Sequence, residues 1–212
     1  MTETEKKLSV KNLFCLRQKK LLFSHLSFEL TAGQALLVEG PNGSGKSSLL
    51  RIAAGLASPS NGDIFWCEKS IHQNRLDYVE HLHYVGHTHG LKLGLTVIEN
   101  LQLASHLNLS DASSFQFDSI LSLLQLHPDK NTQAQFLSAG QKRRLALAKL
   151  FLLPKTLWIL DEPQTALDKN TQTFFLSQLE KHLKQGGLCV VSSHHPDDFK
   201  DLATQKLSLI AC

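Results

Sequence analysis

Short apolar runs alternate with amphipathic stretches along most of the chain. Apolar and polar residues alternate over 26–30, and the next three residues, Thr-Ala-Gly, predict a turn. Continuous apolar runs at 35–39, 156–160 and 188–193 are typical of buried strands, and 64–66 is a shorter strand candidate. The pattern therefore predicts strands in the first and last thirds of the chain.

Helical spacing fills the intervals between these strands. It is clear after a glycine-rich loop and over most of 91–155, where leucines form apolar stripes. Strands that alternate with helices predict an α/β fold with a largely parallel sheet, to which we add an antiparallel β part near the N-terminus. We expect one domain over 1–212. Its core spans about 1–87 and 156–212, and an inserted α-helical subdomain spans about 88–155.

Composition narrows the classes of function. The 212 residues are 42% hydrophobic, which suits one globular unit, and the net charge of +3 argues against nucleic acid as a partner. The sequence has no run of about 18 apolar residues. Its start, MTETEKKLSV, lacks a signal-peptide core, so we expect a cytoplasmic protein. The four cysteines lie far apart and are expected to be free thiols.

A glycine-rich loop follows the first long apolar run. Residues 40–47, GPNGSGKS, match the phosphate-binding pattern G-x-x-x-x-G-K-[ST], with a predicted strand before and a helix after. Lys46 is expected to reach the β- and γ-phosphates, and the Ser47 hydroxyl to bind Mg²⁺. The expected ligands are therefore ATP and Mg²⁺. The predicted nucleotide-binding residues of this P-loop are Gly40, Pro41, Asn42, Gly43, Ser44, Gly45, Lys46, Ser47 and Ser48.

Two carboxylates follow the second long apolar run. In LWILDEP, 157–163, the strand ends at Asp161, at the edge where ligands of open α/β sheets bind. Asp161 is expected to hold Mg²⁺ through water, and Glu162 to polarise the water that attacks the γ-phosphate. A pair of exposed carboxylates after a core strand is the simpler alternative, and the nearby phosphate motif weighs against it.

LSAGQ, 137–141, resembles the LSGGQ signature of ABC-type ATPases, with Ala139 in place of a glycine. Ser138 and Gln141 also fit the N-cap and capping-box positions of a helix start, and both interpretations can hold together. In that family the helix start of one subunit binds the γ-phosphate held by the P-loop of another. The resemblance implies this role for Ser138, Gly140 and Gln141.

Two further motifs extend the resemblance. TALD, 165–168, is similar to the D-loop, and SSH, 192–194, to the switch-histidine motif, in which His194 matches better than His195. The motifs come in ABC order over nearly the whole chain. They imply a P-loop NTPase core of the RecA-like type and a γ-phosphate contact for His194. They also imply a head-to-tail homodimer with two ATP sites, and separate polytopic membrane subunits.

Longer stretches resemble one branch of this family. LFSHLSF, EGPNGSGKSSLLRIAAGL, YVGH and LSAGQKRRLALA are similar to the ATP-binding subunit of the cytochrome c maturation system, the CcmA type. The resemblance implies ATP hydrolysis that powers haem export or release of a haem-loaded chaperone, at the cytoplasmic face of the bacterial inner membrane. We expect no direct haem binding. The alternatives are an ABC ATPase for another substrate, a soluble ABC ATPase on ribosomes or DNA, and an ATP-regulated haem sensor.

The sequence departs from the ABC pattern at the adenine-stacking position. Arg17 stands near the place where most members carry an aromatic residue, and a guanidinium plane can also stack on a base. Phe14 is the alternative if the loop register differs, and a solvated basic turn is the third interpretation.

A second departure lies in HLHYVGHTHG, 81–90, where four histidines occupy odd positions. An unbroken strand would put all four on one face, and a metal site is one interpretation of the cluster, although two glycines interrupt such a strand. His81 and His83 are expected on a sheet edge. His87 stands where ABC proteins carry a glutamine that contacts Mg²⁺ and the attacking water. Only neutral imidazole offers an acceptor nitrogen, so we expect activity to fall more steeply at acidic pH than in a His87→Gln variant.

Overall fold

The computed structural model of the chain describes residues 6–108 and 113–210. Contacts within the chain divide it into two units. The first unit contains the residues up to Tyr84, then Thr156–Glu162, then the residues from Leu179 onward. The second unit contains Val85–Lys155 and Pro163–Gln178. The chain therefore passes between the units several times, and one of these passages falls directly after Glu162.

An antiparallel sheet forms the early part of the first unit, as expected. Its strand order is β2-β1-β4-β5. A two-residue turn, Gln18 and Lys19, joins β1 to β2, and both residues have positive φ, the conformation that tight hairpins require. The strands are β1 Lys7–Arg17, β2 Lys20–Thr31, β4 Asn61–Trp66 and β5 Lys69–Ser70.

A second sheet, with strand order β6-β7-β8-β3-β9, carries the predicted buried strands. Its pairs β7/β8, β8/β3 and β3/β9 are parallel, so the predicted parallel core is confirmed. Every residue of β7 and β8 is buried, which explains why both read as continuous apolar runs. The strands are β3 Ala35–Glu39, β6 Leu82–Val85, β7 Leu157–Asp161, β8 Leu188–Ser192 and β9 Gln205–Ser208.

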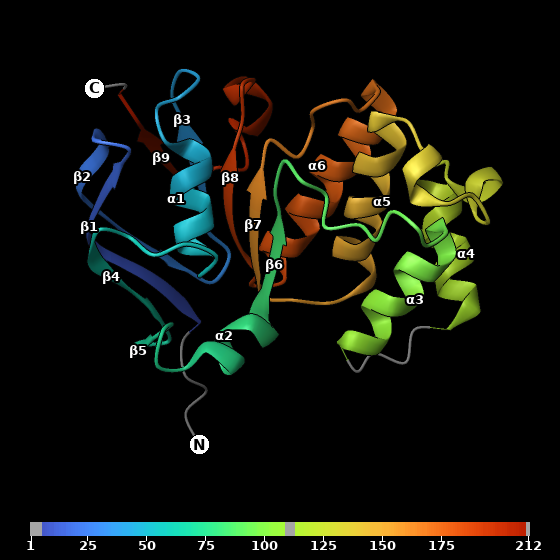
Figure 1. The fold of residues 1–212 in the computed structure, drawn as a ribbon, viewed down its shortest axis with the longest axis horizontal. Coiled ribbons are helices and arrows are strands. Elements are labelled where there is room, and N and C mark those ends of the chain that lie inside the picture. The colour runs from blue at the N-terminus through green and yellow to red at the C-terminus, as the bar shows by residue number, and fades with distance from the viewer. Residues whose placement is uncertain (1–5, 109–112, 211–212) are drawn as a thin grey trace. The chain divides into compact units, whose positions relative to one another are not determined.

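Helix α1, Lys46–Ala53, packs against β7 and β8 (Figure 1). Leu49 and Ile52 of the helix share a buried cluster with Val38 of β3 and Val190 of β8. Each such side chain contributes about 1.5–3 kcal/mol on burial. Apolar packing thus helps to hold α1 against the parallel strands of the first unit.

The second unit is helical. Its three longest complete helices are α3 Val97–Leu107, α4 Ser114–Leu123 and α5 Ala139–Leu152, with short 3₁₀ turns at His127–Asp129 and Ala134–Phe136. Thr96, Ser113 and Ser138 each begin one of these helices with a capping box. Leu101, Leu121 and Leu145, one from each helix, lie in the buried cluster that joins them.

Helix α6, Lys169–Lys184, contains residues of both units, and α2, Arg75–His81, and a 3₁₀ turn at Pro196–Phe199 belong to the first. No helix in the described ranges is long and apolar enough to span a membrane. The described cysteines, Cys15, Cys67 and Cys189, are free thiols, as expected, and Cys212 lies outside the described residues.

The expected position of His81 on a sheet edge is wrong. His81 is the last residue of α2, which buries Tyr78 against the first unit's core. Only His83 lies in β6, at the edge of its sheet as expected, and His87 and His89 follow the strand. Among the described residues, no three of these four histidines lie close enough together to share a metal ion.

Candidate active site

The P-loop connects the end of β3 to the start of α1. Gly40 has φ 144°, and a Cβ there would lie 2.4 Å from the carbonyl oxygen of Leu209 and 2.7 Å from Ser44 Oγ. Only glycine fits so close an approach of backbone to backbone. The loop is therefore held in a conformation that its glycines alone permit.

The polar groups of this loop suit a phosphate chain. Lys46 is 6% exposed, and its Nζ donates to the carbonyl oxygens of Gly40 (2.7 Å) and Pro41 (3.2 Å). Ser44 Oγ is buried and has no hydrogen-bond partner among the described residues. A buried hydroxyl of this kind costs free energy unless a ligand satisfies it. The Lys46 and Ser44 side chains could bind the phosphates of a nucleoside triphosphate. The half-buried Ser47 hydroxyl, in the first turn of α1, could hold the metal ion that accompanies it.

Asp161 is fixed by the end of the neighbouring strand. It is the last residue of β7 and lies opposite Ser192, the last residue of β8, in the parallel register. Ser192 Oγ donates to Asp161 Oδ1 at 2.7 Å, and both residues are almost completely buried. A buried carboxylate needs such donors, and this one also orients the side chain.

Glu162 is the first residue after β7. Its backbone φ is 51°, a left-handed value that costs a non-glycine residue about 1–3 kcal/mol. Its N–H donates to both the carbonyl oxygen and the Oγ of Ser192, at 3.1 Å each, and these bonds hold the strained residue in place. One serine therefore holds the Asp161 carboxylate and the Glu162 backbone.

His194 contacts the second carboxylate directly. Its Nε2 lies 2.6 Å from Glu162 Oε1. His195 instead starts the 3₁₀ turn at Pro196–Phe199, and its backbone N–H donates to Ser193 Oγ at 2.9 Å. The structure thus joins His194, and not His195, to the carboxylate pair.

The signature residues lie in the second unit, at the start of α5. Ser138 Oγ accepts from the N–H of Gln141 at 3.2 Å, and the Ser138 N–H donates to Gln141 Oε1 at 2.8 Å. Gly140 approaches the D-loop closely, since a Cβ there would lie 2.8 Å from the carbonyl oxygen of Ala166. The capping-box interpretation is confirmed, and it leaves the helix N-terminus with the geometry of an anion site.

Asp168 closes the D-loop by capping the start of α6. The backbone N–H of Thr171 donates to Asp168 Oδ1 at 2.9 Å, and this bond is the main cause that lowers the pKa of the Asp168 carboxyl. Arg144 Nη1 of α5 lies 3.8 Å from Asp168 Oδ2. The D-loop is therefore tied to α5 at Gly140 and at Arg144.

Arg17 is the last residue of β1 and is exposed, with Nη2 donating to the carbonyl oxygen of Ser58 at 3.3 Å. Leu22 of the paired strand lies next to the P-loop, because a Cβ on Gly45 would be 3.1 Å from Leu22 Cβ. The hairpin of β1 and β2, whose turn follows Arg17, thus lies beside the P-loop. Adenine stacking by Arg17 stays a prediction.

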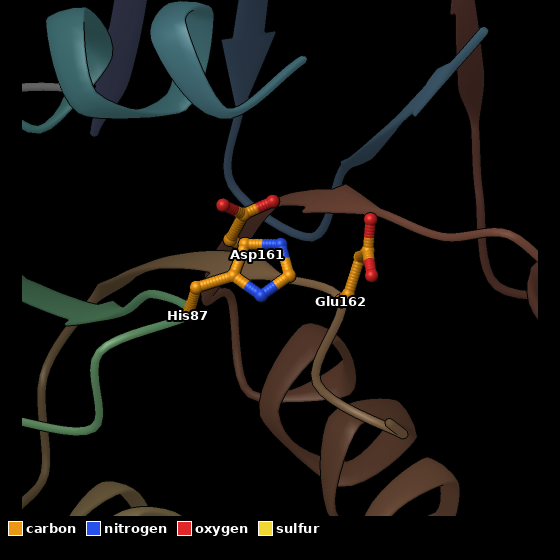
Figure 2. Close-up of side chains that lie close together, drawn as sticks. All are labelled: His87, Asp161 and Glu162. Atoms are coloured by element: carbon orange, nitrogen blue, oxygen red, sulfur yellow. The ribbon is translucent and has the colours of Figure 1, made fainter. Parts of the chain in front are cut away.

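His87 is exposed and follows β6 by two residues, in the second unit. Figure 2 shows its ring on this segment, together with the Asp161 and Glu162 carboxylates at the end of β7. The first unit thus gathers the P-loop, both carboxylates and His194, whereas the second carries His87 and the signature. Magnesium binding by His87 stays a prediction.

Sequence reasoning did not assign two residues that organise these segments, Ser192 and Arg143. Ser192 could have been found as a polar residue at the end of an apolar strand parallel to β7, where side chains of both strands meet. Arg143 lies four residues before Leu147 in α5, so helical spacing puts a charge on the buried stripe. Both signals depend on knowing which elements are neighbours.

The fold and the site define an ATP-hydrolysing subunit of the ABC class. The family model described as ABC transporter matches residues 23–165. The cytochrome c biogenesis ATP-binding export protein CcmA of Methylococcus capsulatus is 42% identical over 91% of this chain and 93% of its own length. The same protein of Escherichia coli K12 is 38% identical over 95% of this chain and 96% of its own length. The chain therefore belongs to the ABC transporter family and, within it, to the CcmA family.

Solved structures agree on the fold. An ATP-binding subunit of an ABC transporter superposes with a TM-score of 0.85 at 23% identity, over 95% of this chain and 85% of that one. A putative ABC transporter ATP-binding protein of Pyrococcus furiosus gives 0.80 at 21% identity, over 96% and 97%. The expected fold class is confirmed. The protein is an ABC-type ATPase, and its family implies ATP binding and membrane partner subunits.

Proposed function

We propose that this chain is the Mg-ATP-hydrolysing subunit of a membrane ABC complex in cytochrome c biogenesis. The observation that supports it most strongly is the arrangement around Ser192, which fixes Asp161 and Glu162 at the ends of β7 and β8 and brings Glu162 to His194. In a chain of this family, such an arrangement beside a P-loop suits γ-phosphate hydrolysis.

Each residue of the first unit has a definite task in this proposal. Lys46 and the loop amides bind the phosphates. Ser47 and Asp161 would hold Mg²⁺, which supplies positive charge to the β- and γ-phosphates when bound. Glu162 accepts a hydrogen bond from the attacking water and polarises it, and His194 keeps the Glu162 carboxylate oriented and contacts the γ-phosphate. His87 offers a neutral ring nitrogen to the same water or metal ion.

The signature completes the site in a second copy of the chain. Ser138, Gly140 and Gln141 form a helix N-terminus, which attracts an anion, and in our proposal the anion is the γ-phosphate bound by the partner's P-loop. A head-to-tail pair of identical chains then closes around two ATP molecules. ATP binding brings the copies together, and hydrolysis separates them.

The proposal that the chain serves cytochrome c biogenesis rests on its relatives, which are named as cytochrome c biogenesis ATP-binding export proteins. We infer that this chain works in that system, at the cytoplasmic face of the bacterial inner membrane, through polytopic membrane subunits. Its ATPase cycle then powers haem export or release of a haem-loaded chaperone, and no direct haem binding is needed.

The test is genetic complementation. A bacterium whose own CcmA gene is deleted receives this chain, together with the membrane subunits of the source organism, and haem-stained c-type cytochromes are measured. The proposal expects cytochromes to return with the wild-type chain and not with Lys46→Ala at equal expression. ATPase activity without any return of cytochromes would assign the ATPase to another substrate.

A further inference from the structure

A buried arginine in α5 bonds to two other backbone segments of the second unit. Arg143 is 3% exposed and lies less than one helical turn after Gly140 of the signature. Its Nε donates to the carbonyl oxygen of Pro163 at 3.0 Å, and its Nη1 donates to the carbonyl oxygen of Gly86 at 2.9 Å. One guanidinium thus bonds to two backbone segments that are far apart in the sequence.

These two carbonyls have a special place along the chain. The chain enters the second unit twice, at Val85 and at Pro163. Pro163 is thus the first residue of one of these segments, and Gly86 is the second residue of the other. Pro163 directly follows the proposed catalytic Glu162, and Gly86 directly precedes His87. The bonds from Arg143 therefore lie one residue from each group that we assign to the attacking water.

Arginine suits this task better than lysine or glutamine. Its planar guanidinium presents several N–H groups at fixed angles, so it can hold two carbonyl oxygens at once. A buried charge is costly unless it is well hydrogen-bonded. Loss of either bond from Arg143 would therefore be unfavourable, so both bonds are expected to persist. A lysine has a single donor centre on a flexible stem and cannot fix both segments in the same way.

A second cation of α5 secures the far end of the histidine segment. Lys149 Nζ donates to the carbonyl oxygen of Gly90 at 3.1 Å. Since Arg143 bonds to Gly86, α5 holds the segment 86–90 at both of its ends. The helix that begins with the signature thus determines the backbone position of His87.

We propose that Arg143 is a positioning residue that links the signature helix to the segments bearing Glu162 and His87. This inference rests on the roles proposed above for those two residues. A partner's γ-phosphate that binds at the start of α5 fixes the position of this helix. Through its bonds from Arg143, the helix then fixes the backbone at Pro163 and Gly86. The attacking water is then oriented only when the signature is occupied.

The test compares Arg143→Gln and Arg143→Lys with Lys142→Gln, which removes a charge from the neighbouring position of α5, where Lys142 Nζ donates to a single carbonyl, that of Gln135. We expect Arg143→Gln to lower kcat by about 10- to 100-fold, since small misplacements of reacting groups have effects of this size. KM for ATP should stay within about twofold, because the P-loop is untouched. Arg143→Lys should fall between, and Lys142→Gln should match the wild type.

Hydrogen exchange supplies a readout independent of activity. Backbone amides of 86–90 and 164–166 should exchange faster in Arg143→Gln, while those of α1 remain unchanged. Activity lost only in proportion to the unfolded fraction, or unchanged exchange in both segments, would overturn the proposal. If Arg143→Gln does not fold, Arg143→Lys carries the same measurements, and failure of both to fold makes Arg143 structural.

The two proposals fail in different ways. Wild-type hydrolysis in Glu162→Gln would contradict the proposed function itself. An inactive Glu162→Gln together with fully active Arg143 variants would overturn only the inference about Arg143.

Discussion

The two units build their parts of the site by different means. In the first unit, Asp161 and Ser192 end neighbouring parallel strands, and the register of the sheet puts them side by side. In the second unit, side chains position the proposed site residues. They act through a capping box, the close approach of Gly140 to Ala166 and the bonds of Arg143. The first arrangement depends on many backbone bonds and a large apolar core, and the second on a few side chains.

This difference predicts how each unit responds to substitution. Changes to reacting side chains in the first unit should remove chemistry while the fold and ATP binding survive. Changes in the second unit should leave ATP binding to the P-loop intact but uncouple the signature from hydrolysis. The substitutions below test this division.

The largest effect is expected from Glu162→Gln. The amide cannot polarise water as a carboxylate does, so hydrolysis should fall by about 10²- to 10⁴-fold while ATP still binds. Phosphate release and nucleotide binding are measured in parallel, and gel filtration with ATP should show an accumulated dimer. Glu180→Gln, which changes an exposed carboxylate that pairs with Lys184 on α6, is the control. Equal turnover in both variants would remove Glu162 from the mechanism.

Ser192→Ala tests the hydroxyl that joins the Asp161 carboxylate to the Glu162 backbone. Its loss leaves Asp161 Oδ1 without that donor, at a cost of about 1–3 kcal/mol, and removes one of the two acceptors that hold the Glu162 N–H. We expect kcat to fall by about tenfold with a lowered melting temperature. Ser193→Ala is the matched control, because the Ser193 hydroxyl accepts from the backbone N–H of His195 instead. A Ser192→Ala protein with unaltered kcat would show that the sheet register alone positions Glu162.

Gly140→Ala tests the second unit. The added Cβ meets the carbonyl oxygen of Ala166 at 2.8 Å, and overpacking of this kind costs about 1–3 kcal/mol. We expect reduced hydrolysis with unchanged ATP affinity. Gly94→Ala is the control, because nothing lies within 4 Å of a Cβ there. If both alanines behave alike, the D-loop contact at Gly140 has no role in coupling.

The smallest effect concerns Lys149 and pH. Burial, with repulsion from Lys92, lowers the pKa of Lys149 to about 8, below the value near 10.4 of an unfolded chain. Below pH 8 the folded protein holds a costly charge, and stability from this residue rises between about pH 8 and 10, where only the unfolded chain keeps the proton. Lys149→Met should therefore stabilise the protein by about 1–2 kcal/mol at pH 7, with a gain that shrinks by pH 10.

Denaturant unfolding at several pH values measures this gain. The exposed Lys181→Met serves as the control. A gain for Lys149→Met that stays constant with pH would show that the lysine is charged at every pH examined.

The sequence predicted the first unit well because its signals are local. An apolar run, a glycine loop and a helix stand next to one another at 35–54, and each appears in the structure at the expected place. The same holds for β7 and its carboxylates. Residues with local motifs were therefore found without knowledge of the fold.

Ser192 and Arg143 show where this reasoning ends. Ser192 bonds to residues about thirty positions earlier, and Arg143 to Gly86, 57 positions earlier. No local periodicity reports such partners. His81 shows a different limit: we expected it on a sheet edge, but it ends the helix α2, in which Tyr78 is buried.

The central claim, that each ATP site needs a P-loop from one copy and a signature from another, is tested most directly by mixing two inactive variants. Lys46→Ala loses the P-loop cation, and Ser138→Arg blocks the start of α5. In a mixed pair, one of the two sites has both parts intact. We expect each variant alone to be inactive and the mixture to recover up to about a quarter of wild-type ATPase activity. No recovery in a mixture shown to contain mixed pairs would contradict the account.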